Sequence, residues 1–204
     1  MSTGACSNCR RPVVFLIGLP ACGKTTLGQA LARLSTPETP ISFTDLDSAV
    51  EAGEGISISR IFAEMGEPYF RHAESRVLRL VAETPGRGPL IVACGGGTPC
   101  NEENIAYMLE RGHVVELQAS REATLRRLLE APPEQRPLVS RVHGDPDLLG
   151  RELDALAQRR APWYGRAHST FDSTRLETPR QVASTCREFI RRFGPLLGLQ
   201  GTQP

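Results

Sequence analysis

Residues 18–25, Gly-Leu-Pro-Ala-Cys-Gly-Lys-Thr, restrict the possible folds of this chain more than any other segment. They follow an apolar run, residues 13–17, and precede a helical spacing of apolar residues at Leu27, Ala30, Leu31 and Leu34. The segment matches the whole pattern G-x4-G-K-[ST], at the strand–helix junction where that pattern occurs. Its glycines allow the backbone to curl, so that several N–H groups point at one anion. The segment therefore predicts a phosphate-binding loop.

The parts of this loop have separate predicted roles. The helix that follows offers free N–H groups and the positive end of its dipole to the same anion as the loop. Lys24 is expected to reach the β- and γ-phosphates, and Thr25 to place its hydroxyl on Mg²⁺. The chain is thus predicted to bind a nucleoside triphosphate and Mg²⁺, through Gly18, Ala21, Cys22, Gly23, Lys24, Thr25 and Thr26.

A phosphate-binding loop does not specify the reaction, because switches, motors and small-molecule kinases share it. A GTPase normally needs a guanine-reading Asn-Lys-x-Asp segment, which this sequence lacks. A motor usually needs more chain than 204 residues. A small kinase should carry an acceptor site instead, with a carboxylate near the reacting hydroxyl and cations for an anionic substrate.

The rest of the sequence alternates between short apolar runs and helical patterns. Strands are predicted at 13–17, 41–44, 89–93, 113–117 and 169–172. Helices are predicted from the loop to about residue 34, between 46 and 82 with a break at Gly66 and Pro68, and then at 105–112, 121–130, 149–164 and 179–193. This alternation predicts an α/β fold of three layers with a parallel sheet. Ligands of such sheets lie beyond the carboxyl ends of the strands. Residues 13–197 are expected to form one domain between a disordered tail, 1–12, and a short tail, 198–204.

Composition narrows the choice of partners and compartment. The 24 basic and 23 acidic residues leave a net charge of +1, so we expect no nucleic-acid partner. No apolar run is long enough to span a membrane, and the first 12 residues lack the apolar middle of a signal peptide. A cytoplasmic chain with reduced thiols is expected. Cys6 and Cys9 form a C-x-x-C, but a structural zinc needs four ligands, so we favour two incidental thiols.

Five further segments carry the residue types that we expect in an acceptor site. They are Asp45-x-Asp47, Arg71-x-x-Glu74, Gly95-Gly96-Gly97, Arg136-Pro-Leu and Arg160-Ala-Pro-Trp-Tyr164. Each also has a structural explanation: aspartates cap helices, Arg71 and Glu74 at a spacing of three can pair on a helix surface, and the glycines or Arg136 can belong to solvated loops. Arg159 can stand in for Arg160. The four histidines show no ligand spacing.

This ordered series beside a phosphate-binding loop resembles the shikimate kinase family, from about Val13 to Phe193. The resemblance implies the fold of the nucleoside monophosphate kinases, with a five-stranded parallel sheet flanked by helices. It implies transfer of the γ-phosphoryl group of ATP to the 3-hydroxyl of shikimate, in aromatic amino-acid synthesis. It also implies a substrate-binding region at about 45–82, a lid at about 130–146 and a monomer.

The resemblance assigns roles position by position. Asp45 and Thr25 are expected to hold Mg²⁺, and Asp47 to contact the substrate hydroxyls and act as base. The substrate contacts are expected from Arg71, Gly95, Gly96, Gly97 and Arg160, with the two arginines on the carboxylate and Glu74 holding Arg71. Lys24, Asp47 and Arg136, the lid arginine, form the catalytic set. Arg175 is expected to stack on adenine.

The sequence departs from the family pattern at the lid, and alternatives stay open. Residues 128–135 are proline-rich and acidic where relatives carry basic residues, and Arg127 is the nearest candidate for a second lid arginine. A gluconate or nucleotide kinase is one alternative, although a nucleotide kinase should carry more arginines for its acceptor. A module that binds ATP without transferring phosphate is the other.

Overall fold

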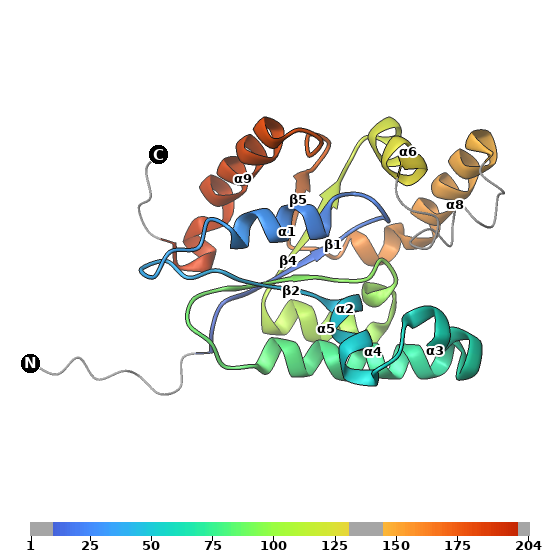
Figure 1. Cartoon of the computed structure of the whole chain (residues 1–204), viewed down its shortest axis with the longest axis horizontal. Coiled ribbons are helices and arrows are strands. Elements are labelled where there is room, and N and C mark those ends of the chain that lie inside the picture. Colours follow the sequence, from blue (N-terminus) through green and yellow to red (C-terminus); the bar gives the residue numbers. More distant parts are fainter. Residues whose placement is uncertain (1–9, 131–144, 200–204) are drawn as a thin grey trace, which may run out of the picture.

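A five-stranded parallel sheet between helical layers forms the fold (Figure 1). The computed structural model describes residues 10–130 and 145–199. The strands run in the order β2-β3-β1-β4-β5, and all four pairings are parallel. Their bounds are β1 (Val13–Ile17), β2 (Ser42–Asp45), β3 (Leu90–Ala93), β4 (His113–Gln118) and β5 (Ser169–Asp172). The predicted fold class is therefore confirmed.

Helices cover both faces of the sheet. One face carries α1 (Lys24–Ala32) and α9 (Pro179–Phe193), and the other carries α2 (Leu46–Glu54), α3 (Ile58–Glu64), α4 (Gly66–Glu83) and α5 (Glu102–Arg111) (Figure 1). The remaining elements are α6 (Arg121–Glu130), α8 (Pro146–Tyr164), η1 (Thr98–Cys100) and η3 (Gly194–Leu197). In Figure 1, α6 and α8 lie at the end of the molecule away from both chain termini.

The apolar run of β1 is buried on both sides because it is the central strand of this sheet. Successive side chains of a strand point to opposite faces. Phe15 and Ile17 accordingly pack with the helices α2 to α5, whereas Leu16 packs with α1 and α9. This two-sided burial explains why residues 13–17 are apolar throughout rather than alternating.

The predicted strands agree with the observed strands to within one residue at each end. The predicted break within 46–82 is confirmed, because α3 ends at Glu64 and Gly66, at φ 80°, directly follows its C-cap Met65, while Pro68 lies in the first turn of α4. A second break, at Gly55 with φ 72°, was not predicted. The helix start at Thr178 is confirmed, since Thr178 and Gln181 form a reciprocal capping box. The local signals thus located the helix boundaries at Gly66 and Thr178 but not the one at Gly55.

Two histidines stack between β4 and β5. The rings of His113 and His168 lie 4.9 Å apart at 17°, and His168 Nδ1 accepts a hydrogen bond from the Val114 N–H. Burial, and then the neighbouring His168, lower the pKa of His113. The folded chain therefore favours neutral His113. Its contribution to the free energy of unfolding is present above the unfolded-state pKa of about 6.5, and it is lost as the pH falls through that value.

Replacing His113 with Gln is expected to weaken this pH dependence. When the pH is lowered from about 7.5 to about 5.5, the urea midpoint of the parent chain should decrease relative to that of H113Q. The exposed His72 supplies the control, because H72Q should keep the parent's dependence. Equal pH dependence in the parent and H113Q would show that the stacked pair carries no linked protonation.

Candidate active site

The loop after β1 adopts the strained backbone that an anion cradle requires. Gly18 and Gly23 have φ values of 142° and 100°, and Ala21, at 58°, is the only non-glycine residue with positive φ among the described residues. A Cβ at Gly18 would lie 2.5 Å from the Leu117 carbonyl oxygen. The Lys24 ammonium donates to the Gly18 and Leu19 carbonyls at 3.0 and 2.9 Å. Lys24 is therefore held at the mouth of the loop, at the N-terminus of α1.

Asp45 caps a helix and also contacts Thr25, the residue predicted to hold Mg²⁺ with it. Its Oδ1 accepts from the Ser48 N–H at 3.2 Å and so caps α2. Its Oδ2 accepts from the Thr25 hydroxyl at 2.7 Å. Two potential oxygen ligands, at the end of β2 and in the first turn of α1, thus lie side by side. One carboxylate, one hydroxyl and phosphate oxygens form the type of site that Mg²⁺ prefers, so these residues fit the ion.

Asp47 lies in the first turn of α2 and does not cap that helix. Burial, and then the charges of Asp45 and Glu74, raise its pKa to about 6, although Lys24 acts in the opposite direction. A carboxylate with a pKa near neutrality can be ionised at working pH and still accept a proton. The position of Asp47 therefore suits a general base.

Each glycine of the loop after β3 lies close to a polar side chain, and Gly95 lies close to Glu74 and Thr98 as well as Asp47. A Cβ built at Gly95 would lie 2.7 Å from Asp47 Oδ1, and one at Gly96 would lie 2.5 Å from Arg160 Nη1. A Cβ at Gly97 would lie 2.8 Å from both terminal nitrogens of Arg71. No side chain larger than a hydrogen fits at any of the three without displacement. The glycines therefore bring a carboxylate and two guanidinium groups to one short stretch of backbone.

This stretch also adjoins the phosphate-binding loop. A Cβ at Gly96 would lie 3.5 Å from the Gly18 carbonyl oxygen. The adjacency follows from the sheet, because β1 and β3 are parallel neighbours and Cys94 N donates to Leu16 O at 3.0 Å. The loops that leave these two strands meet at the same edge.

Arg71 is oriented by a buried carboxylate. Its Nη1 donates to Glu74 Oε2 at 2.9 Å, and Glu74 is 1% exposed. The second oxygen of Glu74 accepts from the Thr98 hydroxyl at 2.5 Å. Arg71 also pairs with the exposed Glu67 at 3.1 Å. The pair of Arg71 and Glu74 is thus a partly buried network rather than the surface pair that the spacing alone allowed.

Arg160 is placed by the end of α8. It is half-buried against Gly96, whereas Arg159 is exposed. Its Nη1 donates to the Tyr164 hydroxyl at 3.3 Å, and that hydroxyl donates to the Gly96 carbonyl at 2.8 Å. Of the two candidate arginines, Arg160 therefore meets the triple glycine.

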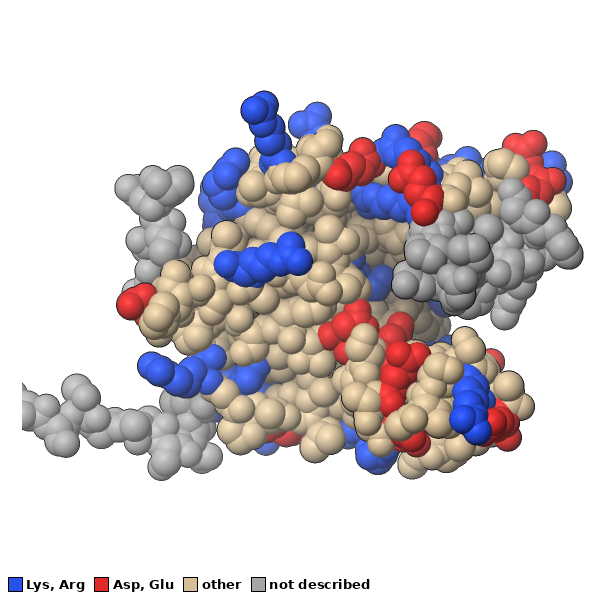
Figure 2. Space-filling model, viewed as in Figure 1, with Lys and Arg blue, Asp and Glu red and all other residues tan. Residues whose placement is uncertain are grey.

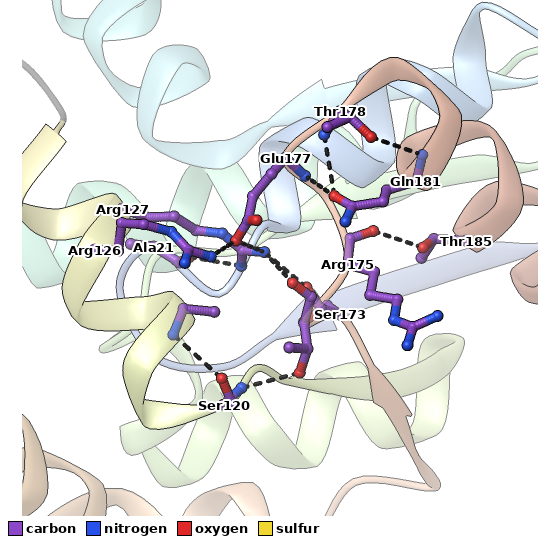
Figure 3. A network of polar contacts seen from close by, with 12 residues as sticks. Ala21, Ser120, Arg126, Arg127, Ser173, Arg175, Glu177, Thr178, Gln181 and Thr185 are labelled. Atoms are coloured by element: carbon purple, nitrogen blue, oxygen red, sulfur yellow. Dashed lines mark hydrogen bonds and ion pairs between the residues drawn. The ribbon is translucent and has the colours of Figure 1, made fainter.

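Arg127 joins the phosphate-binding loop to the segment after β5 (Figure 3). Its guanidinium donates to the backbone carbonyls of Ala21, Ser173 and Thr174 at 3.3, 3.2 and 2.6 Å. Its side chain is 15% exposed, and Glu177 lies 3.8 Å away. Figure 3 shows Arg127 among these groups, whereas the guanidinium of Arg175 points away from them. Arg136 lies outside the described residues, as do Cys6 and Cys9.

Three contributors to the site were not assigned from the sequence in these roles. They are Thr98, Tyr164 and Arg127, whose contacts join segments 24, 68 and 106 residues apart. The proximity of Thr98 and Tyr164 to predicted site residues in the sequence was the only available signal. Their partners depend on long-range packing, which no local pattern encodes.

Outside this site, the described residues offer little evidence for a second functional site. Among residues 10–130 and 145–199, no group of three His, Cys, Asp or Glu side chains could hold a metal. The helices of the described part include none long and apolar enough to cross a bilayer. On the face shown in Figure 2, the basic residues are scattered rather than gathered in one patch. A cavity of about 300 Å³ lies at the opposite edge of the sheet, beside Arg11 and His113, and includes no predicted site residue.

Comparisons of the sequence with known proteins all point to the same family. The sequence model of the family described as shikimate kinase matches residues 20–191. The shikimate kinase of Phocaeicola vulgatus is 38% identical over 172 residues, which are 84% of this chain and 93% of that protein. The shikimate kinase of a Synechococcus strain is 39% identical over 175 residues, 85% of each chain.

Solved structures are similar over almost the whole chain. A crystal structure of shikimate kinase from Bacteroides thetaiotaomicron has a TM-score of 0.79 and 31% identity, covering 90% of this chain and 98% of that one. The shikimate kinase of Acinetobacter baumannii, solved in complex with shikimate, has a TM-score of 0.71 and 27% identity, covering 91% and 94%. A gluconokinase from Sinorhizobium meliloti, at 17% identity and a TM-score of 0.51, shares the fold alone.

Proposed function

The chain belongs to the shikimate kinase family, and we propose that the groups at the carboxyl edge of its sheet are its sites for ATP, Mg²⁺ and shikimate. The reaction transfers the γ-phosphoryl group of ATP to the 3-hydroxyl of shikimate and gives shikimate 3-phosphate and ADP. One observation carries the proposal of the sites. Asp47, Arg160 and Arg71 face three successive glycines that adjoin the phosphate-binding loop.

The nucleotide is proposed to bind along the loop of residues 18–26. Backbone N–H groups and the N-terminus of α1 stabilise the negative phosphates. Lys24 lies within reach because its ammonium already contacts the loop carbonyls of Gly18 and Leu19. Thr25 and Asp45 would hold Mg²⁺, which neutralises charge on the phosphates when it is bound. Arg175 is proposed for the adenine, as the family resemblance implies.

The acceptor is proposed to lie over the triple glycine. The guanidinium groups of Arg71 and Arg160 are suited to one carboxylate, because each offers a planar pair of donors. Asp47 would then orient the reacting hydroxyl and take its proton. The raised pKa of Asp47, about 6, supports this assignment. Arg136, beyond the described residues, is proposed to stabilise the transferring phosphoryl group, as a cationic side chain does in many phosphoryl transfers.

The test of the proposed chemistry is a coupled assay of ADP formation. Turnover is expected with ATP, Mg²⁺ and shikimate together, and removal of Mg²⁺ should abolish it. Gluconate and a nucleoside monophosphate, offered separately in place of shikimate, should give no turnover. Tight ATP binding without shikimate-dependent ADP release would favour the non-catalytic module instead. We also propose a cytoplasmic monomer, and light scattering during size exclusion tests the monomer.

Replacing Gly96 with Ala tests the close approach to Arg160. The added methyl group needs the space within 2.5 Å of Arg160 Nη1, so the guanidinium must move. We expect KM for shikimate to rise about tenfold, which corresponds to ~1.4 kcal/mol, with KM for ATP changed less.

Gly53 provides the control for this substitution. It lies in α2, and a Cβ there would meet only Val77 Cγ2, at 3.9 Å. G53A should therefore leave both KM values near those of the parent. An unchanged KM for shikimate in G96A would contradict the proposed role of the triple glycine.

A further inference from the structure

Tyr164 ends α8 with its hydroxyl between two groups of the acceptor site. The side chain is 4% exposed and packs in the core on the α2–α5 side of the sheet. Its hydroxyl oxygen lies 2.8 Å from the Gly96 carbonyl oxygen and 3.3 Å from Arg160 Nη1. Arg160 and Tyr164 are four residues apart, so they share one face of the helix. The hydroxyl therefore links α8 to the glycine loop.

The direction of both hydrogen bonds follows from the chemistry of the partners. A carbonyl oxygen only accepts, and a guanidinium only donates. The single proton of Tyr164 must therefore go to Gly96, which leaves an oxygen lone pair for Arg160. Burial raises the pKa of Tyr164 above its ordinary value, so the proton stays in place at neutral pH. This hydroxyl has no proton left for a substrate carboxylate.

We propose that Tyr164 is a positioning residue for the acceptor, whose hydroxyl holds the Arg160 guanidinium in line with the Gly96 carbonyl so that its remaining donors meet the substrate carboxylate. The inference rests on the proposed function of Arg160. No carboxylate partner of Arg160 is found among the described residues, where its one side-chain hydrogen bond goes to the Tyr164 hydroxyl. An arginine without such an anchor would lose rotamer freedom when substrate binds, which weakens binding.

The matched replacement is Tyr164→Phe, which keeps the ring and removes the hydroxyl. We expect KM for shikimate to rise about tenfold, with KM for ATP within about twofold of the parent, because the Tyr164 hydroxyl hydrogen-bonds only to Arg160 and Gly96 in the described part of the chain. Tyr107→Phe is the control, since Tyr107 donates to Glu83 at 3.0 Å away from the site. Y107F should change neither KM value.

A double-substitution cycle separates positioning from a general structural effect. If Tyr164 acts through Arg160, then Y164F should add little to R160Q, and the double variant should resemble R160Q alone. Independent effects that multiply would overturn the proposal. So would a loss of thermal stability in Y164F with both KM values unchanged. If R160Q itself leaves KM for shikimate unchanged, the proposed function of Arg160 fails, and the inference falls with it.

A second measurement avoids dependence on the folding of Y164F. The chain has 3 tyrosines, so 3-fluorotyrosine in the Y69F/Y107F background labels Tyr164 alone. The fluorine NMR signal should shift when shikimate is added and should not shift with ATP and Mg²⁺ alone. Saturating shikimate should move it far less in the same chain carrying R160Q. The proposal would be overturned if shikimate did not shift the signal, or if it shifted the signal equally in the R160Q chain.

Discussion

Replacement of Asp47 with Asn is expected to remove most turnover while stabilising the fold at neutral pH. Asn cannot take the proton of the attacking hydroxyl, and a general base typically contributes about 10²–10⁴-fold in rate. Asn keeps the size of Asp and can still hydrogen-bond the acceptor. We therefore expect the loss in kcat, with a smaller change in KM for shikimate.

The gain in stability follows from the environment of Asp47. Its pKa is raised from 3.8 to about 6 in the folded chain, chiefly by burial and by Asp45 and Glu74. The folded state thus binds this proton more tightly than the unfolded state, and ionisation destabilises the fold above about pH 6. A shift of this size corresponds to on the order of 1–3 kcal/mol. The cost shrinks as pH falls from 6 to 3.8 and is gone below that range, where Asp47 is protonated in both states.

Chemical denaturation in the presence of EDTA, without nucleotide, provides the measurement. D47N should be more stable than the parent at pH 8, and the two chains should converge near pH 4. D154N is the control, because Asp154 forms an exposed pair with Arg121, and such pairs contribute little. A D47N chain that is less stable at pH 8, or that retains full kcat, would contradict the assigned role.

Arg71→Gln is expected to damage binding and stability together. Loss of the guanidinium removes one of the two proposed partners of the shikimate carboxylate. Hydrogen bonds to charged groups contribute about 1.5–3 kcal/mol, so KM for shikimate should rise about 10- to 100-fold. The same change leaves Glu74, 1% exposed, with the Thr98 hydroxyl as its remaining donor.

Stability should fall by about 2–3 kcal/mol in R71Q. Breaking a fully buried ion pair costs about 3–5 kcal/mol. The cost here is smaller because the side chain of Arg71 is 34% exposed and Thr98 still donates to Glu74. Adding Glu74→Gln removes the unpaired charge. The double variant R71Q/E74Q should recover most of the stability and none of the affinity for shikimate.

The control for this pair is R60Q, which breaks an exposed pair with Glu64 on the neighbouring helix α3. That variant should match the parent in stability and in both KM values. Urea denaturation and steady-state kinetics measure the two quantities on the same preparations. If R71Q/E74Q regains normal KM for shikimate, then Arg71 only supports the fold and does not bind the acceptor.

Local sequence patterns were sufficient to predict the phosphate-binding loop and most of the fold. The loop of residues 18–25 carries its chemistry in contiguous residues, and its glycines were recognisable because only they readily adopt the φ values found at Gly18 and Gly23. Strand bounds were equally local, since an apolar run buried on both faces has a simple pattern. Gly66 was recognisable as a helix stop because a glycine with positive φ commonly follows a helix C-cap.

Only part of the proposed acceptor site could be predicted from the sequence. Asp47, Arg71 and Arg160 were selected as residue types in order along the chain, but their convergence on three successive glycines was not visible there. The choice of Arg160 over Arg159 came from the family resemblance, and the rotation of α8 against the sheet is its physical basis. The contacts of Thr98 with Glu74 and of Tyr164 with Gly96 were likewise absent from any pattern.

The amino-acid order alone was enough to predict the phosphate-binding loop and the parallel α/β sheet, because both depend on neighbours along the chain. Packing alone decided which atoms meet: the burial of Glu74, the carbonyl contacts of Arg127, and the hydroxyl of Tyr164 between Arg160 and Gly96. These contacts join distant segments at about 3 Å. Such distances depend on how the helices pack against the sheet, and the spacing of residues along the chain does not determine that packing.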